Sequence, residues 1–248
     1  MIKLSDIDIQ EDLFMFNGKM KALTFSYDDG VEQDIRLIEI FNKYGLKCTF
    51  NLNSERLGRK DDSLRIEGKT ISHAKVDAAD VKHLYAGHEV AVHTLTHPLL
   101  PMIEDDGEII RQVEEDRLNL SELCGYEVIG MAYPCGGQNH DDRVANIIRE
   151  NTGVKYSRTI ISNNSFALQD ELYKFQPTVH SYVGFDRLME LGKSFLALDA
   201  DRPQLFYVWG HAYEFDVHDG DWERMEEFCK MMSGHDDIFY GTNKEVLL

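Results

Sequence analysis

Two adjacent aspartates and two histidines four residues apart are residue types that could take part in the chemistry of a divalent metal ion. Asp28 and Asp29 end an apolar segment and precede Gly30, whose backbone freedom lets the chain leave a strand there. His93 and His97 lie four residues apart, so a turn or helix can carry both imidazoles on one side. Catalytic zinc takes imidazole and carboxylate ligands and keeps one position open for water, so two histidines and one aspartate form a chemically complete set. Each pair taken alone also fits an ordinary capping turn or a structural histidine pair.

Two other segments carry groups for proton transfer or for binding an oxyanion. The run from Tyr133 to Gly137 (YPCGG) is a turn that can direct a backbone N–H into a site. No basic residue nearby would form the thiolate of Cys135, so its backbone is of more interest than its thiol. His211 follows an apolar run, and the pKa of a free imidazole suits a general acid or base, although a core or surface histidine is the alternative. The acidic loop from Glu214 to His218 fits a solvated turn better than a second metal site.

Short apolar runs alternate with segments of helical periodicity along the chain, which predicts a parallel sheet with helices between its strands. Such a sheet is either doubly wound or closed into a barrel, and in both the chemistry gathers at the carboxyl ends of the strands. We expect the four groups above to meet at that edge, because each follows a predicted strand. Strands are predicted at residues 22–27, 48–52, 89–92, 127–133, 154–161, 205–209 and 238–240. Helices are predicted around residues 35–44, 78–86, 109–124, 144–152, 188–198 and 222–232, and another helix can begin at residue 243.

Taken together and in this order, the motifs resemble those of the polysaccharide deacetylase family, the carbohydrate esterases with a NodB homology domain. The resemblance spans roughly residues 20–242 and implies an α/β fold, a distorted (β/α) barrel of seven or eight mostly parallel strands. It is carried by Ser26–Gly30 (SYDDG), His93–His97 (HTLTH) with its lead-in Gly87–Val90 (GHEV), Met131–Gly136 (MAYPCG) and Val208–His211 (VWGH).

The resemblance also implies roles for individual residues. Asp29, His93 and His97 would hold a divalent metal, with zinc as the first expectation and cobalt, nickel or iron as alternatives. Asp28 would be the general base and His211 the general acid, while the backbone N–H of Cys135 would stabilise the oxyanion. The implied reaction removes N-acetyl or O-acetyl groups from an N-acetylated sugar or polysaccharide. Tyr133, Trp209 and His180 are expected beside the substrate.

The sequence departs from the family pattern at three places. Ala132 stands where the third motif often carries an arginine that orients the base, so the residue that orients Asp28 is not identified. Cys135 stands where a tyrosine is usual, a change that leaves the backbone N–H in place. The fourth motif, Asp-x-x-Asp-Trp, is not found, and the segment 177–180 is expected in its place. Either His180 or Glu214 would then tune His211. Trp209 either lines a pocket for the substrate or packs into the core.

Composition limits the classes of function. The 26 Lys and Arg residues against 44 Asp and Glu residues give a net charge of −18, which argues against nucleic-acid and anionic membrane partners. No signal peptide or membrane span is visible, and four cysteines without a CxxC pair suit a reducing compartment, so we expect a cytoplasmic protein. No linker or repeat divides the chain, so one catalytic domain over residues 1–248 is expected. Oligomeric state cannot be read from these features.

Three other functions fit part of the pattern. A cytoplasmic location makes a wall polymer an awkward substrate, so hydrolysis of a small amide or cyclic imide on the same scaffold is the first alternative. The departures at Ala132 and in the fourth motif allow a catalytically silent carbohydrate-binding protein. Two histidines and a carboxylate also describe a mononuclear iron oxygenase, but such enzymes usually have antiparallel β folds.

Overall fold

The computed structural model describes residues 15–182 and 184–248 of the chain. The expectation that no signal peptide opens the chain concerns residues that lie mostly before this range. Within it, eight strands form one sheet in the order β7-β6-β5-β2-β1-β9-β8, with β10 also paired to β1, and every pairing in this sheet is parallel. The strands are β1 (Lys21–Asp28), β2 (Cys48–Leu52), β5 (Glu89–Val92), β6 (Gly130–Ala132), β7 (Tyr156–Arg158), β8 (Val179–His180), β9 (Gln204–Gly210) and β10 (Ile238–Tyr240).

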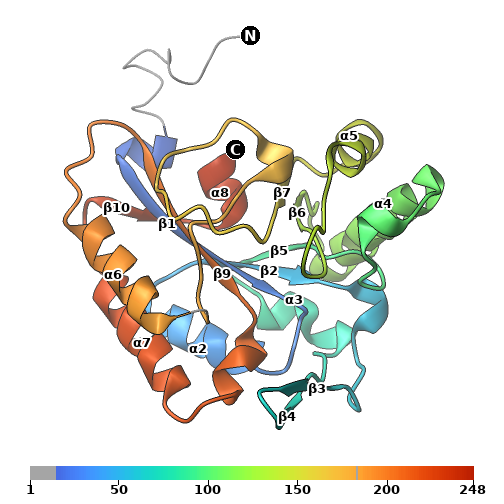
Figure 1. Ribbon diagram of the computed structural model, residues 1–248, viewed down its shortest axis with the longest axis horizontal. Helices are drawn as coiled ribbons and strands as arrows, with labels where there is room; N and C mark the ends of the chain where they lie inside the picture. The colour runs from blue at the N-terminus through green and yellow to red at the C-terminus, as the bar shows by residue number, and fades with distance from the viewer. Residues whose placement is uncertain (1–14, 183) are drawn as a thin grey trace.

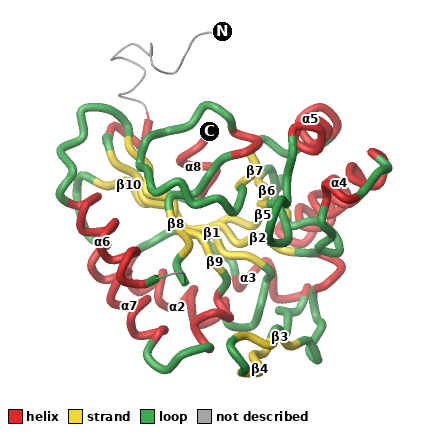
Figure 2. The backbone as a smooth tube through the Cα atoms, viewed as in Figure 1, coloured by secondary structure: helices red, strands yellow, loops and turns green. Residues whose placement is uncertain are grey.

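Helices cover the outside of this sheet (Figure 1). On one side α2, α6 and α7 pack together, and on the other α4 contacts α3 and α5. Figure 2 shows the strands in the middle of the molecule and a two-stranded hairpin, β3 (Ser63–Ile66) with β4 (Lys69–Ser72), set apart from them. The helices are α2 (Asp34–Tyr44), α3 (Val81–Leu84), α4 (Asp106–Cys124), α5 (Asp142–Asn151), α6 (Phe185–Leu196), α7 (Asp221–Met232) and α8 (Asn243–Leu247).

The sequence explains these elements locally. Every residue of β1, β2 and β5 is buried, as expected for strands that are covered on both faces and therefore read as apolar runs. The helix α5 begins where the side chain of Asp141 accepts a hydrogen bond of 2.8 Å from the backbone N–H of Val144, a cap typically worth about 1 kcal/mol. Gly45 and Gly125 end α2 and α4 in the left-handed conformation that glycine adopts without strain.

The predicted fold class is confirmed: the strands are parallel, and helices alternate with them. The sheet is a distorted barrel, because its end strands β7 and β8 do not pair with each other. In the described part of the chain, the segment around Phe175 is what pairs with β7 on that side. Two predicted strands were too long, since β6 and β7 have only three residues each. The predicted helix at 78–86 is a 3-10 turn followed by the four residues of α3. Within residues 15–182 and 184–248, every helix is too short or too polar to cross a lipid bilayer.

Candidate active site

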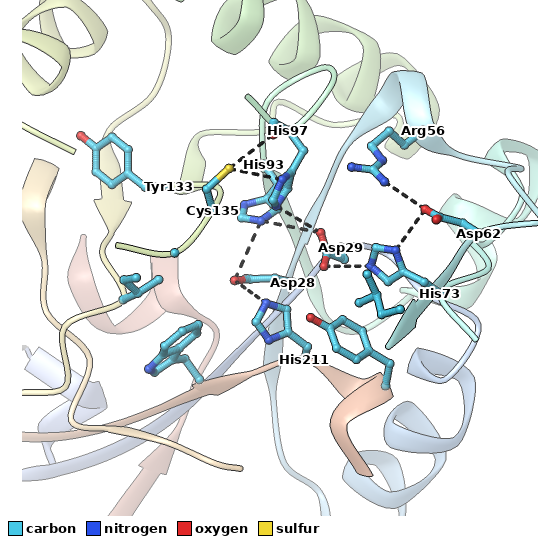
Figure 3. A pocket seen from close by; sticks show the side chains of 15 residues that line it. Asp28, Asp29, Arg56, Asp62, His73, His93, His97, Tyr133, Cys135 and His211 are labelled. Carbon is cyan, nitrogen blue, oxygen red and sulfur yellow. Dashed lines mark hydrogen bonds and ion pairs between the residues drawn. The ribbon is translucent and has the colours of Figure 1, made fainter. Parts of the chain in front are cut away.

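Asp29, His93 and His97 meet at the carboxyl edge of the sheet (Figure 3). Asp29 follows β1, and the two histidines follow β5, two strands away. Asp29 Oδ1 lies 3.9 Å from His93 Nε2 and 3.5 Å from His97 Nε2, and the three ligand atoms lie within 4.8 Å of one another. The predicted ligands therefore come together as one carboxylate and two imidazole nitrogens around one point.

The chemistry of these three side chains fits a divalent cation. His93 Nδ1 lies 2.8 Å from the carbonyl oxygen of Ala132, so the ring donates there and its Nε2 lone pair faces Asp29. Asp29 Oδ1 is buried and accepts no hydrogen bond from any described residue, a costly state that a bound cation would relieve. Burial, together with the nearby His93, lowers the pKa of His97 to about 4, which keeps that ring neutral as a ligand must be.

The backbone at this edge is unusually strained. Of the eight described residues other than glycine with positive φ, four lie here: Asp29 (φ 82°), Thr94 (φ 69°), His97 (φ 67°) and Cys135 (φ 69°). Gly30 also has positive φ, and a side chain on it would meet Leu52 Cδ2 at 2.8 Å. Such conformations cost about 1–3 kcal/mol each and cluster at functional sites.

Asp28, the predicted base, lies beside the three predicted ligands and is held by Arg158, an arginine outside the four sequence motifs. Arg158 Nη2 donates to both carboxylate oxygens of Asp28 at 2.5 Å, and Asn51 Nδ2 donates to Oδ1 at 2.7 Å. Burial alone would raise the pKa of Asp28, but the Arg158 guanidinium and the nearby rings of His93 and His211 lower it below its ordinary value. Asp28 is therefore ionised at neutral pH although it is only 1% exposed.

Arg158 stands next to the position where the family motif often has its arginine. It is the last residue of β7, and its partner in the parallel register of β6 is Ala132. Side chains of registered partners project from the same face of a sheet about 5 Å apart. The guanidinium is fully buried and stacks on Trp209 at 4.6 Å from the ring. A charged residue inside a predicted buried strand was the sequence signal that could have pointed to Arg158.

His211, the predicted acid, is paired with Glu214. His211 Nδ1 lies 3.2 Å from Glu214 Oε1, and His211 Nε2 lies 4.0 Å from Asp28 Oδ2. Burial acts to lower the pKa of His211, but the Glu214 carboxylate outweighs it and, with Asp29 and Asp28, raises that pKa to about 9. Burial likewise acts to raise the pKa of Glu214, while the rings of His211 and His180 bring it down to about 2.

The expectation of a solvated turn at Glu214 was wrong, because this carboxylate is buried between two histidines. His180, from β8, lies behind the cavity rather than in its lining: its Nε2 is 3.0 Å from Glu214 Oε2, and its ring stacks on Trp209 at 4.3 Å. His180, His211 and Glu214 also form a second group whose ligand atoms lie within 4.8 Å of one another. Both imidazoles of this group already contact the carboxylate of Glu214. We therefore interpret Glu214 and His180 as residues that position His211 and not as ligands of a second metal ion.

A cavity of about 360 Å³ opens above these groups. Tyr133, Trp209 and Cys135 line it together with Leu64, Ile160 and Tyr213, and the expected roles of the first three toward the substrate stay predictions. Cys135 Sγ lies 3.6 Å from His97 Nδ1, and burial raises the pKa of the thiol, which agrees with an unreactive side chain.

Comparison with known protein families agrees with this geometry. The model of a family described as polysaccharide deacetylase matches residues 16–156. Among curated proteins, no sequence matches the chain significantly.

Solved structures with the same fold include esterases and a pseudoenzyme. A family 4 carbohydrate esterase from Streptomyces lividans, solved in complex with acetate, is 13% identical with a TM-score of 0.55, over 90% of this chain and 92% of that one. A family 4 acetyl xylan esterase from Clostridium thermocellum, solved with a cobalt ion, is 13% identical with a TM-score of 0.55. The match covers 91% of this chain and 90% of the esterase chain. A third structure is a mutant of a family 4 pseudoenzyme from Bacillus anthracis in which enzymatic activity was restored. It is 18% identical with a TM-score of 0.56, and the match covers 92% of this chain and 68% of the mutant chain. At these identities the similarity establishes the fold.

Proposed function

The chain belongs to the polysaccharide deacetylase family of hydrolases that act on non-peptide carbon–nitrogen bonds, and we propose that it removes acetyl groups from an N-acetylated sugar or polysaccharide with the help of a divalent metal. Zinc is the metal that we propose, because one carboxylate and two imidazoles with an open position are its usual catalytic ligands. The observation that carries the proposal is the buried Asp29 Oδ1, which has no hydrogen-bond donor among the described residues and faces the Nε2 atoms of His93 and His97.

Asp29, His93 and His97 would hold the cation, which when bound would acidify a water molecule and polarise the acetyl carbonyl group. Asp28 accepts the proton of the attacking water, since its lowered pKa keeps it ionised and Arg158 fixes its orientation.

Two groups then act on the tetrahedral intermediate and its leaving group. The backbone N–H of Cys135 donates a hydrogen bond to the developing oxyanion from the cavity wall. His211, protonated at neutral pH because its pKa is about 9, gives its proton to the departing amine. Acetate and a free amino sugar leave. The ring of Trp209 is placed to pack against the sugar or the acetyl group.

Acetate release from N-acetylglucosamine and its oligomers, measured with and without Zn²⁺ or Co²⁺, tests this function. We expect turnover that needs the metal and that is lost in Asp28→Asn, while Asp28→Asn retains one bound metal per chain. A wild-type protein that binds metal but hydrolyses no acetamide or acetyl ester would contradict the proposal and favour the silent carbohydrate-binding alternative.

A further inference from the structure

A line of polar side chains backs Asp29 on the side opposite the two histidines (Figure 3). Asp29 Oδ2 lies 3.1 Å from His73 Nε2, and the other ring nitrogen, Nδ1, lies 3.1 Å from Asp62 Oδ2. The same Asp62 oxygen accepts a hydrogen bond of 3.0 Å from Arg56 Nη2. Both ring nitrogens of His73 therefore face carboxylate oxygens, and the ring is only 5% exposed. None of these contacts serves the proton transfers proposed above.

The hairpin β3–β4 places this line of residues. Asp62 directly precedes β3 and His73 directly follows β4, and the backbone N–H of His73 donates to the carbonyl oxygen of Asp62 at 2.9 Å. The hairpin therefore places Asp62 on the side of the His73 ring opposite Asp29. At its tip, Glu67 is held by His218 Nε2 at 3.0 Å and by the hydroxyl group of Tyr182 at 3.1 Å.

The chain leaving the hairpin is tied to the segment that carries Asp29. The backbone N–H of Val76 donates to the carbonyl oxygen of Gly30 at 3.0 Å, and that of Glu32 donates to the carbonyl oxygen of Ala74 at 2.9 Å. Between Ala74 and Val76, the fully buried Lys75 places its Nζ 3.0 Å from His73 Nε2 and 3.9 Å from Asp29 Oδ1, beyond hydrogen-bond distance of that oxygen. The ring of His73 therefore has a fixed position relative to the backbone of Asp29.

We propose that His73 is a positioning residue for metal binding: by holding Oδ2 of Asp29, it keeps Oδ1 directed at the space between His93 and His97. The inference rests on the metal site of the proposed function. Asp29 sits on strained backbone, with φ 82°, and a carboxylate can rotate about its terminal bond. Without a partner on Oδ2, that oxygen would lose its hydrogen bond in a buried site, and the carboxylate would no longer be held in its ligating orientation.

Three variants of His73 separate this role from a general contribution to folding. The amide nitrogen of glutamine reaches the place of the ring Nε2, whereas that of asparagine reaches only the place of Nδ1. His73→Gln therefore keeps the donor toward Asp29, His73→Asn keeps only the donor toward Asp62, and His73→Ala keeps neither. Loss of such outer contacts typically weakens metal affinity about 10–100-fold. We expect that loss in His73→Asn and His73→Ala, and a loss of less than about 5-fold in His73→Gln.

The measurement is the affinity of the whole chain for Zn²⁺ and Co²⁺, determined by competition with a chromogenic chelator, with the visible absorption of bound Co²⁺ as a report on its ligand geometry. Unfolding midpoints without metal show whether the variants fold alike. His235→Ala, at a partly buried histidine that contacts Met231 O, is the matched control and should leave the affinity unchanged.

The outcomes distinguish the two proposals. If the wild-type chain binds neither ion, or if Asp29→Ala binds it equally well, the proposed metal site fails. If the wild-type chain binds the ion through Asp29, but His73→Asn and His73→Gln have equal affinities and equal Co²⁺ spectra, the positioning role of His73 is refuted and the proposed function stands.

Discussion

Replacing Arg158 with alanine should both destabilise the protein and remove most of its hydrolytic activity. The change takes away the guanidinium that lies 2.5 Å from each carboxylate oxygen of Asp28. Among the described residues, Asn51 is then the remaining side-chain donor to this carboxylate. Asp28 would then be an ionised group in a buried site without its counter-ion.

The expected magnitudes follow from this loss. Breaking a buried ion pair by removing one partner costs about 3–5 kcal/mol, a large part of the roughly 5–15 kcal/mol by which a domain is stable. In the wild type, the lowered pKa of Asp28 stabilises the folded state at pH values above the ordinary aspartate pKa. This stabilisation is lost as the pH falls through the pKa that Asp28 has in the folded protein. In Arg158→Ala, burial raises that pKa, so the stability deficit is greatest at neutral pH and shrinks as acid protonates Asp28. General-base catalysis contributes about 10²–10⁴-fold, so kcat/KM at pH 7 should fall by at least about 100-fold.

Urea unfolding at several pH values and the pH profile of kcat/KM measure both effects. The acidic limb of the kcat/KM profile should move to higher pH in Arg158→Ala.

Arg117→Ala, which removes a largely buried arginine paired with Glu114 at 2.6 Å on α4, is the control and should lower stability without moving the profile. Adding Ala132→Arg to Arg158→Ala should recover activity, because residue 132 is the registered neighbour on β6. An Arg158→Ala protein with kcat/KM within threefold of the wild type and an unmoved acidic limb would refute the role of Arg158.

Three further predictions concern the acid, the oxyanion site and the metal. Glu214→Gln removes the carboxylate that raises the pKa of His211 to about 9, so the alkaline limb of the kcat/KM profile should move to lower pH; an unmoved limb would exclude His211 as the acid. Cys135→Ala should keep kcat/KM within about threefold in an acetate-release assay, since only the backbone N–H is used, and a 100-fold loss would show that the thiol takes part. Zn²⁺ at about 100 times its dissociation constant should stabilise the chain by about 2.7 kcal/mol in thermal unfolding, and His97→Ala should abolish this gain; an equal gain in the variant would place the ion elsewhere.

The strands that position the site could be predicted from the sequence for a physical reason. β1, β2, β5 and β9 are buried almost throughout, so they must read as apolar runs, and glycines mark the ends of several helices. The hairpin β3–β4 has mostly exposed or half-exposed residues, so it does not read as an apolar run, and the alternation of polar and apolar residues in β3 extends over only four positions. β8 has only two residues and carries no recognisable periodicity.

The same contrast holds for the site. Asp28 ends β1, Asp29 follows it, and the two histidines follow β5. Both strands are predictable, and motifs at fixed spacing point to these residues. Arg158 and His73 act through partners 130 and 44 residues away along the chain, and only the folded structure shows those pairings. The position of Glu214 was likewise not predictable, since an acidic loop in the sequence does not reveal which of its carboxylates is buried.

The proposed metal site is tested most directly by crystals grown with Zn²⁺ and an anomalous difference map recorded at the zinc absorption edge. The map should show a peak about 2.0–2.2 Å from Asp29 Oδ1, His93 Nε2 and His97 Nε2. A map without a peak at these atoms, or with its strongest peak among His180, His211 and Glu214, would contradict the proposed metal site.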